Sequence, residues 1–419
     1  MMLFSWLWYC FSCLIFVSHG FTVHHQPQQF QTAVADSPVQ SDLESSPDSQ
    51  QADLFQQLDS RFDYEGRIQS PTSGNDDEVH RCGFVSIIGA PNMGKSTLLN
   101  ALLEEDLCIA THKPQTTRHA ILGILSTETS QVCLVDTPGV IETPAYKLQE
   151  GMMEAVVGAF HDADVLLVVT DVFSTPIPSD KLFQRVQASN NPVVVVINKI
   201  DLSQSINPYD ASEHRTIAPE QAVQLWRELL PNAVAILPAS ASAGPSDPGI
   251  VALRALLTND ANAPAAIRGL GRPIPGMFID STVVVPTQLL PPSPPLYDSE
   301  HLTDKTERFI ASEMIRAALF ESLHAELPYC CQVEVTAFRD NGAASTSCEI
   351  DATILVERDS QKGIVVGKGG AQIGMIRRAA VQQLQDFFAT KVQLQLIVKV
   401  DKDWRKNPKR LKEYGYLKK

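Results

Sequence analysis

Short apolar runs alternate with helical patterns through the first half of the chain. The first run is followed by a glycine-containing turn and then by a helical pattern with leucines at positions 98, 99 and 102. Strands that alternate with helices are typical of a doubly wound α/β domain with a parallel sheet, which we place at residues 81–264. Four of the runs predict its buried strands, at residues 84–88, 132–135, 192–197 and 233–237.

The pattern changes towards the end of the chain. Helical periodicity predicts helices at residues 306–323 and 371–388, the first with Asp304 as its N-cap. The order helix, two strands, glycine-rich turn, helix, strand predicts a separate α+β domain at residues 303–403, after a linker at 265–302. Its three strands are expected at residues 332–338, 349–356 and 392–400.

Both ends of the chain depart from these patterns. Residues 1–20 combine an apolar, aromatic stretch with small residues at positions 18 and 20, which is typical of a signal peptide. The stretch is short for a membrane span, so we expect no stable membrane insertion of the mature chain. Residues 21–80 are poor in large apolar side chains and rich in Gln, Ser, Asp and Pro, which predicts disorder. Residues 404–419 are a basic tail.

Charge is distributed unevenly along the chain. The whole chain has a net charge of −14, which by itself argues against a nucleic-acid partner. Residues 358–419, however, hold 15 Lys and Arg against 5 Asp and Glu, so this region is strongly basic and favours binding to nucleic acid. The eight cysteines form no disulfide framework and suit a reducing compartment.

The turn after the first strand, GAPNMGKS at residues 89–96, matches a phosphate-binding loop. Its glycines let backbone N–H groups point at phosphate oxygens, and the helix that follows adds its N-terminal partial charge. Lys95 would reach the β- and γ-phosphates, and the Ser96 hydroxyl would ligate Mg²⁺. We expect nucleotide contacts from Gly89, Asn92, Met93, Gly94, Lys95, Ser96 and Thr97.

Two further segments would complete the phosphate end of the site. Asp136 follows the predicted strand 132–135 and can hold Mg²⁺ through water, and the Gly139 N–H would contact the γ-phosphate. Residues 113–118 (KPQTTR) would be a switch loop, in which Thr116 or Thr117 closes on Mg²⁺ when the γ-phosphate is present. The sequence does not decide between these threonines, and Thr117 is taken as the candidate. The candidate metal ligands are Ser96, Thr117 and Asp136, and the candidate catalytic groups are Lys95, Thr117, Asp136 and Gly139.

The motif NKID at residues 198–201 follows a buried strand and indicates guanine recognition. The Asp201 carboxylate can accept hydrogen bonds from N1–H and the 2-amino group, a donor pair that adenine lacks. Asn198 would address the opposite edge of the base, and the stem of Lys199 would pack along the ring. A backbone N–H at Ser240 and Ala241 would contact the guanine O6.

These motifs resemble those of the translation-factor-related GTPases. In Ras-like enzymes, a glutamine that orients the attacking water follows the segment equivalent to residues 136–139. Here Val140 and Ile141 follow, which implies slow intrinsic hydrolysis. In related GTPases of this pattern, an asparagine at the position of Asn92 helps to bind K⁺, so the resemblance implies K⁺ as well as Mg²⁺ and GTP or GDP.

The turn GKGG in the C-terminal domain lies between a strand and a helix. In this order of elements it matches a type II KH domain, whose GxxG loop clamps the backbone of a single-stranded nucleic acid. Cations also flank an aromatic residue in the basic tail, as in an RNA-facing segment. The candidate RNA-binding residues are Gly367, Lys368, Gly369, Gly370, Arg377, Arg378, Trp404 and Arg405.

A GTPase domain followed by a KH domain is similar to the Era family, from about residue 82 to the C-terminus. The resemblance implies binding to the 3′ end of small-subunit rRNA under control of the GTP state, and a role in assembly of the small ribosomal subunit. We expect the chain to be a monomer. The alternative is a non-hydrolysing, GTP-gated RNA-binding module in which Val140 marks lost catalysis. The segments that support the resemblance are residues 113–119, 294–297, 302–304, 307–309, 326–329 and 356–363.

A signal peptide conflicts with an rRNA-binding function, because a secretory compartment contains neither ribosomes nor GTP. Two successive targeting signals resolve the conflict: a signal peptide, followed by a transit peptide that begins at Phe21. We therefore expect the plastid stroma as the destination, with the mitochondrial matrix as the alternative. If residues 1–20 were not cleaved, they would instead act as a membrane anchor.

Overall fold

The computed structural model describes residues 79–111, 113–141, 143–174, 181–203, 218–258, 278–279, 289–340 and 347–417. The predicted signal segment at 1–20, and all but the last two residues of the predicted disordered segment at 21–80, lie outside these ranges. Within the described ranges, no helix is both long enough and apolar enough to cross a membrane.

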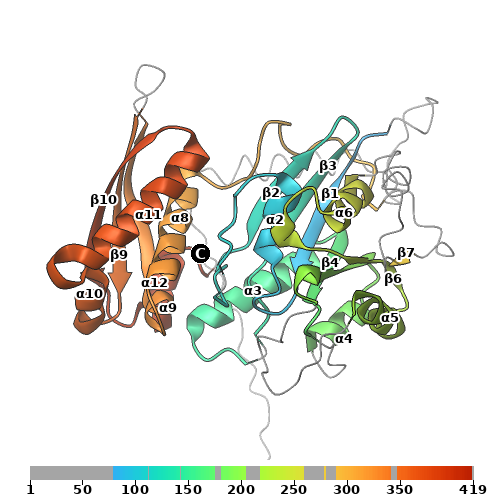
Figure 1. The fold of residues 1–419 in the computed structure, drawn as a ribbon, viewed down its shortest axis with the longest axis horizontal. Helices are drawn as coiled ribbons and strands as arrows, with labels where there is room; N and C mark the ends of the chain where they lie inside the picture. The colour runs from blue at the N-terminus through green and yellow to red at the C-terminus, as the bar shows by residue number, and fades with distance from the viewer. Residues whose placement is uncertain are drawn as a thin grey trace, which may run out of the picture. The chain divides into compact units, whose positions relative to one another are not determined.

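The N-terminal domain is built on a sheet whose strands, as far as the structure describes them, have the order β2-β3-β1-β4-β5-β6-β7 (Figure 1). Strands β1, β3, β4, β5 and β6 run parallel, whereas β2 and β7 at the two edges are antiparallel to their neighbours. The strand bounds are Arg81–Ile88 (β1), Ile121–Ser126 (β2), Ser130–Asp136 (β3), Val165–Asp171 (β4), Val193–Asn198 (β5), Ala233–Pro238 (β6) and Phe278–Ile279 (β7).

Helices cover both faces of this sheet and create two cores. On β5, Val194 and Val196 belong to the core under α2 and α6, whereas Val193, Val195 and Ile197 belong to the core under α4 and α5. Burial on both faces explains why this strand is an unbroken apolar run rather than an alternating one. The helices are α2 (Lys95–Leu103), α3 (Lys147–His161), α4 (Lys181–Gln187), α5 (Pro219–Leu229) and α6 (Pro248–Thr258).

The predicted doubly wound α/β fold is confirmed. The four predicted strands correspond to β1, β3, β5 and β6, with ends that differ by up to three residues. Strands β2, β4 and β7 were not predicted. The sequence of β4, VLLVVTD, holds the same kind of apolar run as the others and could have been recognised by it.

The C-terminal domain has the element order of a type II KH domain. Its sheet has the order β10-β9-β8, with β9 parallel to β10 and antiparallel to β8, and α8 and α11 pack against each other beside it (Figure 1). The bounds are α8 (Glu307–Ser322), α9 (Leu327–Cys330), β8 (Gln332–Asp340), β9 (Ser347–Val356), α10 (Asp359–Val366), α11 (Ala371–Phe388) and β10 (Lys391–Val400).

One local expectation for this domain is wrong, and one helix was not predicted. The N-cap of α8 is Thr306, whose Oγ1 accepts a hydrogen bond from the Phe309 N–H at 3.3 Å, and not Asp304. Helix α10 was not predicted, although the Gln361 side chain accepts from the N–H groups of Glu357 and Arg358 and so satisfies two backbone donors at its start.

The end of the predicted linker is held against the N-terminal domain. The Cys82 N–H donates to the Pro291 carbonyl at 3.2 Å, next to a bridge between Arg81 and Pro292. The Gln131 side chain accepts from the N–H groups of Leu296 and Tyr297 at 2.8 and 2.9 Å. Residues 289–302 therefore form a strap along β1 and β3 rather than a free connection.

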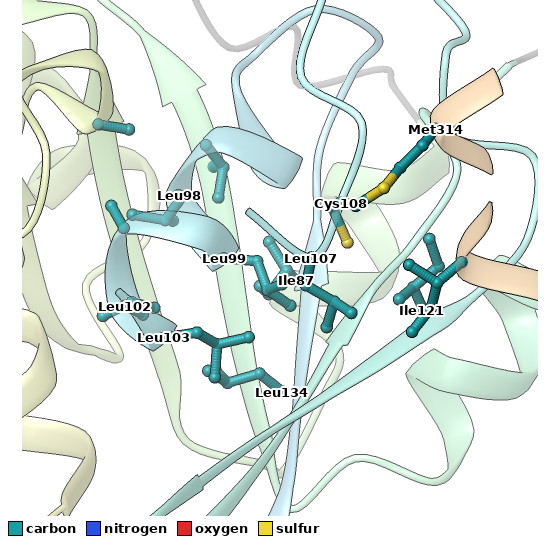
Figure 2. Close-up of a cluster of buried hydrophobic side chains, with 14 of the residues drawn as sticks. Ile87, Leu98, Leu99, Leu102, Leu103, Leu107, Cys108, Ile121, Leu134 and Met314 are labelled. Carbon is teal, nitrogen blue, oxygen red and sulfur yellow. The ribbon is translucent and has the colours of Figure 1, made fainter. Parts of the chain in front are cut away.

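Helix α8 is buried around most of its circumference, because it lies between the KH sheet and the N-terminal domain. Met314 of this helix points towards Cys108, at the edge of the core under α2 (Figure 2). The two domains consequently share one continuous apolar cluster that includes Ile121 and Ile315.

Candidate nucleotide site and RNA-binding loop

The phosphate-binding loop joins the end of β1 to the start of α2, and Lys95 is the first residue of the helix. Its backbone is left-handed at Asn92 (φ 67°) and at Gly94 (φ 84°). A side chain at Gly94 would also collide with Asn198, because an added Cβ would lie 2.3 Å from its Nδ2 atom. Glycine is therefore required at position 94 both by its conformation and by close packing on the base motif.

Three hydroxyl and carboxylate side chains from separate segments meet beside this loop. The Ser96 hydroxyl donates to Oδ2 of Asp136 at 2.7 Å and lies 2.8 Å from the Thr117 hydroxyl, which donates to the same oxygen at 3.3 Å. The Asp136 Oδ1 atom is buried and has no hydrogen-bond partner in the described part of the chain. Oxygen ligands and an unsatisfied buried carboxylate fit Mg²⁺, whose charge would help to hold the phosphates.

Thr116 points elsewhere. Its hydroxyl donates to the Lys113 carbonyl at 2.7 Å and lies 2.8 Å from the Thr111 hydroxyl. The geometry therefore brings Thr117, and not Thr116, to Ser96 and Asp136.

Lys95 and Asp136 are charged groups in a buried environment. The Lys95 Nζ donates to the carbonyls of Gly89 and Ala90 at 3.1 and 2.9 Å. Burial lowers the pKa of Lys95 to about 8, and the nearby charge of Asp136 limits this shift. For Asp136, burial raises the pKa, although the charge of Lys95 and the hydrogen bond from Ser96 act in the opposite direction. Opposed shifts of this kind are typical of groups that bind charged ligands.

Residues 136–141, here called the second switch segment because Asp136 and Gly139 are the predicted Mg²⁺ and γ-phosphate contacts, lie against the phosphate-binding loop. The loop at residues 113–118 is called the first switch segment. An added Cβ at Gly139 would lie 2.7 Å from the Pro91 Cα, and the Val140 N–H donates to the Gly89 carbonyl at 3.2 Å. Thr97 and Gly139 line the same hollow as Lys95. Asn92, Gly94, Ser96 and Thr117 line it as well, whereas the predicted contacts Gly89, Met93 and Asp136 do not.

Asn198 ties the base motif to the phosphate-binding loop. Its Nδ2 donates to the Met93 carbonyl at 2.9 Å, and its Oδ1 accepts from the Ala241 N–H at 2.9 Å. The Ser240 hydroxyl donates to Oδ1 of Asp201 at 2.6 Å. The predicted base-binding residues are therefore grouped at the ends of β5 and β6, as parallel strands require.

Asp171, the last residue of β4, was missed by the sequence interpretation. Its buried Oδ2 forms an ion pair of 2.9 Å with Lys199 Nζ, which also donates to the Asn92 carbonyl at 2.7 Å. Its Oδ1 accepts from the Phe173 N–H and the Ser174 hydroxyl. Asp171 thus fixes the lysine that links the base motif to the phosphate-binding loop. A carboxylate that ends an apolar strand, as Asp136 also does, was the available signal.

We predict that Asp171→Asn weakens GTP and GDP binding alike, by roughly tenfold, because a charge-assisted hydrogen bond to Lys199 is lost. Titration with a fluorescent guanine nucleotide measures the change. Asp162→Asn, which removes an exposed carboxylate at the end of α3, is the matched control. Wild-type affinity in Asp171→Asn would contradict the proposed positioning of Lys199.

The first switch segment contacts the KH domain through its two cations. Lys113 Nζ donates to the carbonyls of Phe320 and Leu323 at the end of α8. The buried Arg118 donates to three carbonyls around α9, those of Pro328, Tyr329 and Cys331. These are carbonyls at or beside helix ends, where cations also interact favourably with the helix dipole.

A buried ion pair on α8 contacts the same segment from the KH side. Arg316 pairs with Glu313 and donates to the Thr116 carbonyl, one residue before Thr117. Burial alone would raise the pKa of Glu313, but the charge and hydrogen bonds of Arg316 outweigh it and hold that pKa below its usual value. The switch segment KPQTTR thus places Thr117 at the candidate metal site and its cations on the KH domain.

The GxxG loop is accessible in the structure. Gly367, Gly369 and Gly370 all have positive φ angles, and Lys368 and Gly369 are exposed. An added Cβ at Gly369 would meet nothing within 4 Å, so phosphates have free access there. The predicted contacts Arg377 and Arg378 are exposed on α11. Ile364 and Met375, both about half exposed on the helices that flank the loop, are apolar contacts that the sequence interpretation did not single out.

The expectation that Trp404 and Arg405 face RNA is not met. Trp404 is completely buried, and its indole N–H donates to the Cys330 carbonyl at 3.1 Å. Arg405 pairs with the buried Glu357 and lies over the Tyr146 ring. The cations around Trp404 suggested a solvent-facing segment; Lys402 and Lys406 are indeed exposed, but the indole and Arg405 pack inwards.

A doubly wound domain with a phosphate-binding loop and a guanine motif, followed by a KH domain, defines a guanine-nucleotide-binding protein with an RNA-binding module. The family model described as "50S ribosome-binding GTPase" matches residues 84–199, and the model described as "KH domain" matches residues 326–405. The chain is 34% identical over 340 residues to "GTPase ERA1, chloroplastic" of Zea mays, covering 80% of this chain and 71% of the relative. It is 34% identical over 348 residues to "GTPase Era" of Syntrophus aciditrophicus, covering 82% and 98%. The chain belongs to the Era family of GTPases.

Solved structures agree with this assignment. A variant of Aquifex aeolicus Era bound to GDP·AlF₄⁻ matches with a TM-score of 0.63 at 28% identity, over 80% of this chain and 99% of that chain. Era in complex with MgGDPNP and nucleotides 1506–1542 of 16S ribosomal RNA matches with a TM-score of 0.63 at 29% identity, over 81% and 99%. The predicted family and its GTPase activity on a guanine nucleotide are thereby confirmed.

Proposed function

We propose that this GTPase binds the 3′ end of small-subunit rRNA through its KH domain and assists assembly of the small ribosomal subunit. One observation carries the proposal: the segment that brings Thr117 to Ser96 and Asp136 is hydrogen-bonded on both sides to α8 and α9 of the KH domain. A change at the γ-phosphate would therefore move residues that the RNA-binding domain contacts. The Era relative whose structure contains nucleotides of 16S ribosomal RNA supports rRNA as the ligand.

We propose that binding of rRNA stimulates GTP hydrolysis by this protein. Val140 cannot orient a water molecule, so intrinsic turnover should be slow. The test is GTP turnover in KCl with and without an RNA that matches the 3′ end of small-subunit rRNA. Stimulation by this RNA, and not by a scrambled one, is the expected result. GTP binding without turnover under every condition would instead favour the non-hydrolysing RNA-binding module.

We propose K⁺ as an activator that acts through Asn92. The residue lies in the phosphate-binding loop with a left-handed backbone, and its carbonyl is held by Lys199. Turnover in KCl should exceed turnover in NaCl at equal ionic strength. Equal rates in the two salts would remove K⁺ from the proposal.

We propose the plastid stroma as the site of action and a monomer as the active form. Two relatives are named as chloroplastic, from Zea mays and from Oryza sativa, and the two predicted targeting signals support the same organelle. Import of the labelled precursor into isolated plastids and mitochondria separates the two organelles, and light scattering of the purified chain measures its mass.

Gly369→Asp should weaken RNA binding by at least tenfold and leave GTP binding unchanged, because it places a carboxylate where phosphates approach the exposed loop. RNA affinity is measured by fluorescence anisotropy at fixed salt concentration. Gly363→Asp is the control, since position 363 on α10 is also exposed and open but lies outside the GxxG loop. Normal RNA binding by Gly369→Asp would contradict the role of the loop.

A further inference from the structure

The last described residues of the chain fold back between the KH domain and the GTPase domain. Trp404–Lys406 and Pro408–Glu413 (α12) form two short helical turns, followed by Tyr414 and Tyr416. Residues 404–417, here called the C-terminal clamp, place Trp404, Leu411 and Tyr416 in one buried cluster with Leu148 and Met152 of α3.

The clamp contacts the helix that follows the second switch segment. Ile141, two residues after Gly139, belongs to the same cluster, and its N–H points to the Met153 sulfur of α3 at 3.2 Å. The contact with α3 is close at Gly151, where an added Cβ would lie 2.5 Å from the Tyr416 carbonyl oxygen. The absence of a side chain at position 151 is therefore what lets the clamp lie on the helix.

The clamp also contacts the first switch segment. The Tyr416 ring stacks on the His119 ring with centroids 4.3 Å apart, and the Arg118 guanidinium lies 5.8 Å from the centroid of the Trp404 ring. Arg118 and His119 directly follow Thr117 in the chain. The clamp thus touches the predicted switch loop and also the residues just after Gly139, whose N–H is predicted to contact the γ-phosphate.

The clamp also forms hydrogen bonds with the KH domain. The Trp404 indole donates to the Cys330 carbonyl, and the Tyr416 hydroxyl donates to Gln332 Oε1 at 2.6 Å, at the start of β8. Arg405 pairs with Glu357, which lies between β9 and α10, and α10 leads directly into the GxxG loop. The clamp therefore reaches the element that positions the RNA-binding loop.

We propose that the C-terminal clamp couples the two switch segments to the KH domain, so that its seating on α3 and on His119 depends on the bound nucleotide and sets RNA affinity. This inference rests on the proposed function, in which GTP controls RNA binding. It assigns the basic C-terminal segment a regulatory contact inside the molecule, in place of the RNA contact that its composition suggested.

Two glycines of α3 provide a matched test. Gly151→Ala adds one methyl group that meets the Tyr416 carbonyl oxygen, whereas Gly158→Ala adds the same group where nothing lies within 4 Å. Both positions are inside α3, where alanine is the better helix former, so the helix itself should tolerate both changes. Neither residue belongs to the nucleotide site.

The first measurement is hydrogen exchange of residues 404–417 in the full chain, with GDP and with a non-hydrolysable GTP analogue. In the wild type and in Gly158→Ala, the amides of the clamp should exchange at different rates with GDP and with the GTP analogue. In Gly151→Ala, they should exchange faster than in the wild type with both nucleotides. Equal protection of the wild-type clamp with both nucleotides would overturn the proposal. This readout needs no RNA, so it is independent of whether the proposed RNA ligand is correct.

The second measurement is RNA affinity in the same two nucleotide states. We expect a ratio of about fivefold or more in the wild type and in Gly158→Ala, within the usual range of coupling between sites, and less than about twofold in Gly151→Ala. Tyr416→Ala, which removes the ring on His119 and the hydrogen bond to Gln332, should give the same loss. The proposal would be overturned if the clamp exchanged faster in both variants while the ratio of RNA affinities in the two nucleotide states stayed as in the wild type. Failure of the wild type to bind the RNA in either state would instead contradict the proposed function.

Discussion

Lys95→Ala should lose GTP binding almost completely. Lys95 is the buried cation of the phosphate-binding loop, and removing one partner of a buried, hydrogen-bonded charge pair costs about 2–5 kcal/mol, or roughly 30-fold to 5,000-fold in affinity. Equilibrium titration with a fluorescent GTP analogue measures the loss. Lys147→Ala removes an exposed cation at the start of α3 and should bind GTP normally. An affinity of Lys95→Ala within tenfold of the wild type would contradict the assignment of this loop.

The largest effect on stability is expected from Arg316→Met. Arg316 and Glu313 are both buried on α8, and breaking a buried ion pair by removing one partner costs about 3–5 kcal/mol, because the remaining charge is left uncompensated. The free energy of unfolding from urea titration at neutral pH measures this cost. The double variant Glu313→Leu with Arg316→Met should recover much of the loss, since no buried charge remains. A double variant as unstable as Arg316→Met would contradict this explanation.

The same pair predicts how stability depends on pH. Arg316 holds the pKa of Glu313 below its unfolded value, so the pair stabilises the fold above the ordinary pKa of a glutamate, about 4.3. This contribution is lost as the pH falls through the lower pKa of the folded state. In Arg316→Met, burial no longer opposed by Arg316 raises the pKa of Glu313 above its unfolded value, so the carboxyl becomes neutral in the variant first. The stability difference between wild type and Arg316→Met should therefore begin to shrink above the ordinary glutamate pKa of about 4.3 and continue to shrink as the pH falls.

The sequence predicted most of what depends on local pattern. Strands such as β5 are buried on both faces, so an apolar run is sufficient to identify them, and the glycines at 89 and 94 with Lys95 mark the turn that follows β1. The choice between Thr116 and Thr117 could not be made from sequence. Adjacent residues of a loop point in different directions, and only the fold places one of them beside Ser96 and Asp136.

Two of the misses concern contacts between distant segments. The ion pair between Asp171 and Lys199 forms because β4 and β5 are neighbours in the sheet, a relation that neither segment reveals alone. The burial of Trp404 depends on α3, which lies more than 240 residues earlier in the chain. A tryptophan among cations gives the segment the same composition whether its ring stacks on a base or fills a core. Composition therefore could not distinguish these two outcomes.

In the described part of the chain, the hydrogen bonds that the two cations of the first switch segment donate to the KH domain end on main-chain oxygens. Lys113 and Arg118 contact five carbonyls, those of Phe320, Leu323, Pro328, Tyr329 and Cys331. The positions of these carbonyls depend on the backbone at the ends of α8 and α9 and not on the side chains of those residues. A chimaera that joins this GTPase domain to the KH domain of a relative only about one-third identical should therefore keep these hydrogen bonds, provided that the helix ends are retained.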